Sequence, residues 1–276
     1  MRNSVRPRKR FGQHFLHDPN IIRKIIDAIQ PRSHDLFVEV GPGRGAITRP
    51  LAEAVKRLDV IEIDRDLAAA LKDQNSHGNV TVYRADVMNF AFETLVQPGE
   101  KLRLAGNLPY NISSPLLFYL LDSSHLFEDI HVMLQKEVVD RITALPGNRT
   151  YGRLTVALAA RCRAENLFEI QPGSFSPPPR VKSSFLRLTP LQTPKISAVL
   201  APAFGQLVTQ AFNMRRKQLS NALRELLDAN QIRSAGVDPS QRAEDLDVDA
   251  FIRLAELWLQ QGSPRGDEKS LSNRLK

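Results

Sequence analysis

The sequence predicts an α/β fold: a doubly wound, mostly parallel sheet followed by a small all-α C-terminal domain. Two observations carry this prediction. In the first half of the chain, short apolar strand-like runs alternate with helical segments five times. Such alternation is typical of a parallel sheet with helices on both faces. After residue 194 the apolar residues follow helical spacing only, which indicates a separate helical domain.

The composition is that of a globular protein with a basic surface. The chain has 276 residues, 42% of them hydrophobic, and a formal net charge of +8, which favours a polyanionic partner and nucleic acid before membrane. A sole cysteine, Cys162, excludes an internal disulfide and fits a reducing compartment. We find no apolar run of transmembrane length and no signal peptide, so we expect a cytoplasmic protein.

Shifts in composition mark the expected domain boundaries. Residues 1–10 form a basic arm without acids, in which Arg8, Lys9 and Arg10 can lie along phosphates. Residues 263–276 are rich in Ser, Lys and Arg and read as a disordered tail. Between them we expect a sheet domain over residues 11–190 and a helical domain over residues 195–262.

A glycine-rich turn follows the first strand, Leu36–Val40. Its spacing, Gly41-Pro42-Gly43-Arg44-Gly45, lets a backbone approach a bound nucleoside closely. No Lys-Ser/Thr pair follows, so the turn is not a Walker loop, and the ligand need not carry a pyrophosphate. Glu39, just before the glycines, either anchors the turn or meets a cationic group of the ligand.

Acidic residues end the next two strands. Glu62 lies about twenty residues past the glycines, where an acid can bind both hydroxyls of a ribose. Asp86 follows the strand Val80–Arg84 and can accept a hydrogen bond from an adenine amine, although a helix cap is the competing interpretation. Because carboxyl ends of parallel strands meet at one edge, we expect Gly41, Glu62, Asp86 and Asn107 to share a crevice.

The fourth strand leads into Asn107-Leu108-Pro109-Tyr110. The Asn107 amide oxygen and the Leu108 carbonyl can accept the two N–H bonds of an adenine amine while Tyr110 stacks on the ring. The residues alone leave open a simple strand-ending turn.

Two later segments complete the set of candidate residues. The stiff segment Phe175-Ser176-Pro177-Pro178-Pro179-Arg180-Val181 either places the Phe175 ring opposite Tyr110 or packs it into the core. Arg215, Arg216 and Lys217 lie beside a helix and favour phosphate contact. We find no metal-spaced His/Cys cluster and no nucleophile triad.

These motifs, in this order, resemble those of the ribosomal RNA adenine N6-dimethyltransferases. The resemblance runs from about residue 8 to residue 260, is most like the bacterial small-subunit (16S) enzymes, and implies a Rossmann-like methyltransferase sheet. It rests on Arg8 to Leu16, Glu39 to Gly45, Asn107 to Ile112, Phe175 to Val181, and Arg215-Arg216-Lys217.

The resemblance implies S-adenosylmethionine as methyl donor and N6,N6-dimethylation of two adjacent adenosines near the 3′ end of 16S rRNA. The implied catalytic residues are Asn107, Leu108, Tyr110 and Phe175, and Arg8, Lys9, Arg10, Arg215, Arg216 and Lys217 would bind RNA. The implied cofactor contacts are His14, Leu16, Gly41, Gly43, Glu62, Asp86 and Asn107. The family usually has Asn where this chain has His14. Because both side chains can form hydrogen bonds, we expect the loop to keep its role.

Two alternatives remain at this stage. A DNA adenine N6-methyltransferase can use a similar Asn-x-Pro-Tyr loop, but the chain has no large target-recognition domain. A non-catalytic RNA-binding assembly factor would not need the cofactor residues. Nothing in the sequence indicates oligomerisation, so we expect a monomer that partners the small ribosomal subunit, without a metal or a membrane.

Overall fold

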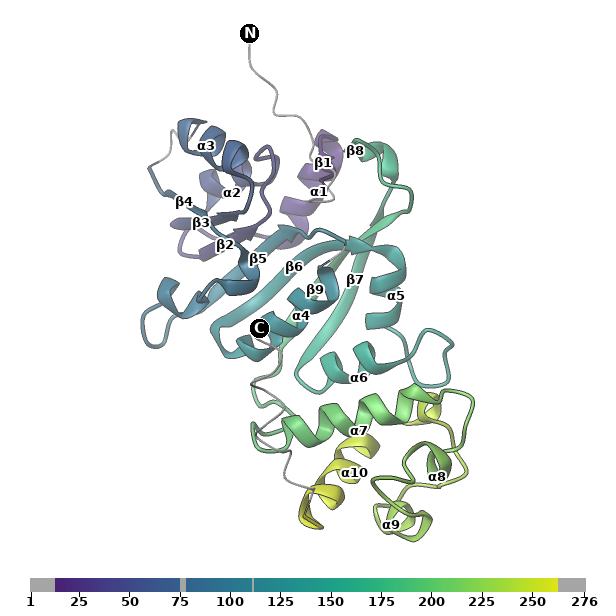
Figure 1. Cartoon of the computed structure of the whole chain (residues 1–276). Coiled ribbons are helices and arrows are strands. Elements are labelled where there is room, and N and C mark those ends of the chain that lie inside the picture. Colours follow the sequence, from purple (N-terminus) through teal and green to yellow (C-terminus); the bar gives the residue numbers. More distant parts are fainter. Residues whose placement is uncertain (1–12, 75–77, 111, 263–276) are drawn as a thin grey trace. The chain divides into compact units, whose positions relative to one another are not determined.

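The computed structural model describes residues 13–74, 78–110 and 112–262, so the basic arm and the C-terminal tail lie outside the described residues. The chain divides into two compact units (Figure 1). The first unit contains residues up to 143 and residues 161–192, and the second contains residues 144–160 and those from 193 onward. Among the described helices, none has the length and apolar character needed to cross a bilayer.

The first unit is built on a seven-stranded sheet. Five neighbouring strands are parallel, and the predicted doubly wound, mostly parallel sheet is therefore confirmed. β9 lies between β6 and β7 and is antiparallel to both. The order across Figure 1 is β4 (Val80–Arg84), β3 (Arg57–Glu62), β2 (Leu36–Val40), β5 (Leu102–Asn107), β6 (Phe127–Gln135), β9 (Ser183–Pro190) and β7 (Cys162–Ile170).

Both faces of the sheet are buried, which explains why its central strands read as continuous apolar runs. Phe37 and Ala105 pack with the first three helices in one core cluster. Their neighbours Val38 and Leu104 point to the opposite face and are also fully buried. The helices of this unit are α1 (Pro19–Ile29), α2 (Thr48–Ala54), α3 (Arg65–Gln74), α4 (Ser113–Asp122) and α5 (Lys136–Ile142).

Helix α1 is fixed at both ends. The Asp18 side chain accepts from the backbone N–H of Asn20 and Ile21 and caps the helix, and Pro19 lies in its first turn. At the other end, the buried Arg103 donates to the carbonyl of Ile29 at 2.7 Å. This arrangement anchors the helix that follows the entry segment, residues 13–16.

The entry segment itself is held by a two-stranded sheet. β1 (Phe15–Leu16) pairs antiparallel with β8 (Phe175–Ser176), at the start of the proline-rich segment. The backbone N–H of His17 also donates to the Ser174 carbonyl at 3.0 Å. Two stretches about 160 residues apart in the sequence are therefore joined directly.

The second unit is helical and has its own core. α7 (Ala201–Asn213) and α10 (Val248–Gln260) pack together around Phe204, Leu207 and Phe251. The shorter helices are α6 (Arg153–Ala159), α8 (Leu219–Ala222) and α9 (Ala229–Ser234), and the short 3-10 turns of both units are Val87–Asn89, Phe92–Leu95, Ser124–Leu126, Pro172–Ser174 and Ala243–Asp245.

Two details of this unit differ from the expected organisation. Residues 144–160 were expected in the sheet domain, but Tyr151, Val156 and Ala160 belong to the helical core. The apolar residues from Leu219 to Leu227 follow helical spacing, but they do not form one continuous helix, because α8 ends at Ala222 and turns follow it. After Ala222 the chain forms short turns, and its apolar side chains still pack into the core of the second unit.

Candidate active site

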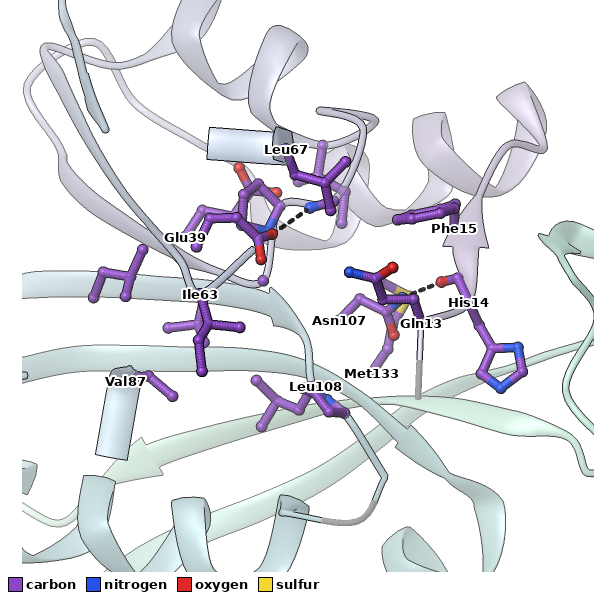
Figure 2. Close-up of a pocket in the computed structure, with 18 of the residues that line it drawn as sticks. Gln13, His14, Phe15, Glu39, Ile63, Leu67, Val87, Asn107, Leu108 and Met133 are labelled. Atoms are coloured by element: carbon purple, nitrogen blue, oxygen red, sulfur yellow. Dashed lines mark hydrogen bonds between the residues drawn. The ribbon is translucent and has the colours of Figure 1, made fainter. Parts of the chain in front are cut away.

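A single pocket collects the predicted residues at the carboxyl ends of the central strands. The strand order reverses at β2, which has β3 on one side and β5 on the other, and this reversal creates the crevice where open α/β sheets bind ligands. Figure 2 shows the pocket between the glycine turn and the entry segment. The sequence-predicted residues that line it are His14, Leu16, Gly41, Gly43, Glu62, Asp86, Asn107, Leu108 and Tyr110.

Close backbone approach explains two of the glycines around the pocket. Gly43 has φ +59°, and a Cβ built on it would lie 2.9 Å from the Phe15 ring. A Cβ on Gly106, in β5, would lie 2.6 Å from the Val40 carbonyl of the neighbouring strand. Side chains at these positions would push apart the entry segment and the two strands that form the crevice.

The ribose candidate Glu62 is fixed by backbone donors. Its Oε1 accepts from Asp64 N at 2.9 Å, and its Oε2 accepts from Gly43 N at 3.3 Å. Burial raises the pKa of Glu62 to about 7, although these backbone hydrogen bonds act in the opposite direction. The carboxylate is therefore held in place beside the glycine turn before any ligand arrives.

Glu39 lies deeper and is less well satisfied. Its side chain is 2% exposed, and its Oε2 has no hydrogen-bond partner among the described residues. Burial raises the pKa of Glu39 to about 8, the nearby Thr48 hydroxyl lowers it in part, and the charge of Glu62 raises it further. Glu39 lines the pocket, where it can meet a cationic group of a ligand.

The pocket is acidic although the chain is basic. Glu39, Glu62 and Asp86 line it, whereas the only Lys or Arg among its lining residues is Arg44, whose guanidinium lies over the Phe15 ring at 4.5 Å. Such a lining favours a ligand with net positive charge.

Apolar walls that the sequence analysis missed flank the two acids. Ile63 follows Glu62 and Val87 follows Asp86, and both line the pocket. Ile63 is 46% exposed, which is unusual for a large aliphatic side chain beside a buried sheet. An apolar residue directly after a strand-ending acid was the available signal, because a planar base needs an apolar surface beside its polar edge.

Asp86 forms the cap that was one of the two interpretations the sequence left open. Its Oδ1 accepts from Met88 N at 2.9 Å and caps the short turn Val87–Asn89. The same residue lines the pocket. A cap fixes the side chain at the rim, where its carboxylate can also meet an adenine amine.

The orientation of the Asn107 amide is set by the entry segment. Its Nδ2 donates to the His14 backbone carbonyl at 2.9 Å (Figure 2). Because one side of the amide is occupied as a donor, Oδ1 on the other side is directed as an acceptor. The sequence prediction needed this orientation but had no means of specifying it.

Tyr110 and His14 form a stacked pair at the mouth. Their ring centroids are 5.8 Å apart with an interplanar angle of 26°. The Tyr110 hydroxyl shares a 2.6 Å hydrogen bond with Ser183 Oγ, and His14 Nδ1 donates to the Pro177 carbonyl at 2.7 Å. The His14 side chain thus joins the entry segment to the proline-rich segment.

Phe175 requires a correction. It does not line the pocket, and its side chain is 2% exposed within the core that contains Ile25 and Phe185. Strand pairing places Phe175 opposite Leu16 and draws the ring inward. The structure therefore adopts the core-packing alternative, and Phe175 does not face Tyr110 across the site.

The predicted RNA-binding residues of the second unit have unequal environments. Arg215 Nη2 donates to the carbonyl of Arg149 at 2.7 Å and to the carbonyl of Tyr151 at 3.2 Å, and it pairs with Glu244. Arg215, Arg216 and Lys217 are all exposed, as is Arg149, so the three predicted residues differ in their contacts and not in their exposure. Arg215 thus holds the loop that carries Arg149, a cation that the sequence analysis missed because it lies 66 residues away.

Comparison with known proteins identifies the family. Residues 5–260 match the family model described as ribosomal RNA adenine dimethylase. The chain belongs to this family. It is accordingly an rRNA adenine dimethyltransferase that uses S-adenosylmethionine, and membership disfavours the DNA methyltransferase and the non-catalytic alternatives.

The similarity to curated relatives extends over nearly the whole chain. Ribosomal RNA small subunit methyltransferase A of Pseudomonas aeruginosa is 48% identical over 251 residues, covering 91% of this chain and 94% of the relative. The protein of the same name from Nitrosococcus oceani is 46% identical over 255 residues, covering 92% and 97%.

Solved structures of the dimethylase type agree with the fold. A dimethyladenosine transferase from Plasmodium falciparum has a TM-score of 0.76 at 26% identity, covering 90% of this chain and 98% of that one. The 23S rRNA methyltransferase ErmE has a TM-score of 0.71 at 25% identity, covering 89% and 100%.

The pocket of the dimethylase fits S-adenosylmethionine. This molecule carries an adenine, a ribose and a positively charged sulfonium beside an amino-acid group. Acids at the ends of two strands match the ribose hydroxyls and the adenine amine, and the walls Ile63 and Val87 match the ring. The unpartnered buried oxygen of Glu39 matches the positive charge.

Proposed function

We propose that this protein dimethylates N6 of two adjacent adenosines near the 3′ end of small-subunit (16S) rRNA. The observation that carries the proposal is the orientation of Asn107, whose Nδ2 is engaged by His14 so that Oδ1 is directed as an acceptor beside the acidic pocket. The names of the relatives support the small subunit as substrate. The enzyme acts as a monomer in the cytoplasm.

The cofactor residues hold the methyl donor in place. Glu62 binds the ribose hydroxyls, Asp86 binds the adenine amine, and the Gly41 and Gly43 turn with Leu16 encloses the remainder. S-adenosylmethionine supplies an electrophilic methyl group when bound. Asn107 ends β5 and lines the same pocket, where it would face the target base.

Asn107 and Leu108 activate the target amine. The lone pair of an adenine amine is delocalised into the ring, so the amine is a poor nucleophile. Two acceptors, Asn107 Oδ1 and the Leu108 carbonyl, draw its N–H bonds out of the ring plane and localise that pair on nitrogen. This interaction is stronger in the transition state than in the planar ground state, which is the condition for catalysis. Alignment with the methyl group contributes most of the remaining acceleration.

Tyr110 positions the base and does not act on the proton. Burial raises the pKa of its hydroxyl, although the hydrogen bond with Ser183 acts in the opposite direction, so Tyr110 stays protonated at neutral pH. With His14 stacked on one side, the Tyr110 ring is held rigidly as a platform for an unstacked adenine. The ammonium product is acidic enough to lose its proton to water, and no general base is required.

RNA is bound by exposed cations of the second unit. Arg216, Lys217 and Arg149 provide the phosphate contacts, and Arg215 holds the Arg149 loop against the helical core. Arg8, Lys9 and Arg10, which lie outside the described residues, add further phosphate contacts. Because each contact releases counterions, subunit binding should weaken steeply with salt.

A methyl-transfer assay tests the proposed substrate. Labelled S-adenosylmethionine is offered with small subunits that lack the modification, with already modified subunits, with naked rRNA and with duplex DNA. We expect label in the unmodified subunits only. Label in DNA, or tight subunit binding without any transfer, would contradict the proposed function.

A further inference from the structure

The proline-rich segment, residues 175–181, does not present Phe175 to the target base, because that ring packs into the core. The segment leads directly into β9, whose first residue is Ser183. Ser183 is fully buried, and its Oγ shares a 2.6 Å hydrogen bond with the hydroxyl of Tyr110. A hydroxyl group is costly to bury unless it is hydrogen-bonded. The contact with Tyr110 therefore compensates for the burial of a polar group at the start of this strand.

Ser184, the next residue of β9, provides an internal comparison. Its side chain is also fully buried, but its Oγ has no hydrogen-bond partner among the described residues. Successive side chains of a strand point to opposite faces of the sheet, so only one of the two serines can face Tyr110. The two residues thus have the same chemistry and the same burial, and they differ in whether they contact the loop that carries Tyr110.

We propose that Ser183 is a positioning residue for the target adenine and that it acts through Tyr110. The proposal rests on the proposed function, in which the Tyr110 ring is the platform for the unstacked base. An aromatic ring turns about its two side-chain bonds unless a second point on it is fixed. Ser183 fixes the hydroxyl end of the ring, and His14, with its ring centroid 5.8 Å away, supports one face. The plane of the platform is therefore set before the base arrives.

Both supports of the Tyr110 ring depend on the proline-rich segment. His14 Nδ1 donates to the carbonyl of Pro177 at 2.7 Å, and β1 pairs with β8 at the start of the segment. Ser183 follows the end of the same segment and is held in the sheet by pairing with β6 and β7. Consecutive prolines make a chain stiff and extended, so they keep the two supports at a fixed separation. The prolines thereby have a role in positioning the base.

Single-turnover methyl transfer tests the proposal. Unmodified small subunits and saturating S-adenosylmethionine are used with the wild type, Ser183→Ala and the matched control Ser184→Ala. We expect the rate to fall roughly three- to tenfold in Ser183→Ala, the range that one lost hydrogen bond supplies. The rate should be unchanged in Ser184→Ala, whose hydroxyl has no partner among the described residues. Affinity for S-adenosylmethionine, measured by calorimetry, should be unchanged in both, because neither serine is among the described residues that line the pocket.

Tyr110→Phe and the double variant Ser183→Ala/Tyr110→Phe separate positioning from a general loosening of the fold. Tyr110→Phe keeps the ring and removes the same hydrogen bond with Ser183 left in place, so it should lower the rate by a similar factor. Adding Ser183→Ala should have no further effect, because no tyrosine hydroxyl remains to be held. A further loss in the double variant, or equal rates for Ser183→Ala and Ser184→Ala, would overturn the proposal and leave the proposed function intact. Absence of transfer by the wild type would overturn both.

Discussion

Asn107 Nδ2 donates to the backbone carbonyl of His14 at 2.9 Å, and this bond connects the catalytic loop to the entry segment. The bond uses the main chain of His14. Replacement of the family's usual Asn by His therefore leaves it in place, while the His14 side chain is free to stack on Tyr110. One contact thus orders the loop and orients the acceptor that the reaction needs.

Asn107→Ala should separate catalysis from cofactor binding. We expect methyl transfer to fall by roughly 10²–10³-fold, because one acceptor for the amine is lost. Affinity for S-adenosylmethionine, measured by calorimetry, should stay largely intact. Glu62→Ala is the contrasting variant and should lose cofactor affinity. Equal losses of transfer and cofactor affinity in Asn107→Ala would contradict the role assigned to this side chain.

Glu39→Gln should stabilise the cofactor-free protein at high pH. The pKa of Glu39 is about 8 in the folded protein and near 4.3 in an unfolded chain, so between these values the native state binds more protons and its stability falls as pH rises. The Glu39→Gln variant has no carboxyl group to ionise at this position, so its stability does not fall in this way. Thermal unfolding at pH 9 should show a gain of a few kcal/mol, at about 1.4 kcal/mol per pKa unit, and no gain at pH 4. A gain independent of pH would argue against an ionised, buried Glu39.

Asp129→Asn should destabilise the first unit. Burial alone would raise the pKa of Asp129, but His131 and Arg103 beside it lower the value to about 2. Arg103 pairs with both Asp129 and Asp35 while it holds the end of α1, so removing one partner should cost about 3–5 kcal/mol at pH 7.

The pH dependence of that loss provides the check. A lowered pKa contributes stability above the unfolded value of about 3.9, and the contribution disappears as pH falls through about 2. Urea unfolding should therefore show a constant gap between wild type and Asp129→Asn from pH 5 to pH 8, narrowing below pH 4. A gap that widens in acid would have the wrong sign.

Arg215 and Arg216 should differ although they are neighbours. Arg216→Ala should leave the melting temperature unchanged and reduce the salt slope of RNA binding by about one, as expected for a lost phosphate contact. Arg215→Ala should lower the free energy of unfolding by about 0.5–1.5 kcal/mol, because the carbonyls of Arg149 and Tyr151 lose their donor. If Arg215→Ala changes only the salt slope, Arg215 contacts phosphate directly and is no tether.

The central strands were predictable because they are buried on both faces and read as nearly uninterrupted apolar runs. The strand Leu36–Val40 has the bounds that its sequence suggested. The strand order, in which β9 lies between β6 and β7, depends on pairing between segments that are distant in the sequence. Such pairing leaves no local sequence pattern. The same reason explains residues 144–160, whose helical spacing does not say which core they join.

The pocket was predictable where a residue acts through its position at a strand end, as Glu62 and Asn107 do. Phe175 shows the limit, because an aromatic residue in a stiff loop can point into a core or toward a ligand, and only its pairing with Leu16 decides. Arg215 shows another, because its partners Arg149 and Glu244 are distant in sequence. The sequence shows where a positively charged residue stands, but it does not show which group that residue contacts.

The most direct test of the central claim is to locate the methyl groups. Small subunits lacking the modification are incubated with the enzyme and S-adenosylmethionine, and their rRNA is digested and analysed by mass spectrometry. We predict two adjacent N6,N6-dimethyladenosines near the 3′ end of the small-subunit rRNA, absent with Asn107→Ala. Methyl groups elsewhere in the rRNA, or full modification by Asn107→Ala, would contradict the account.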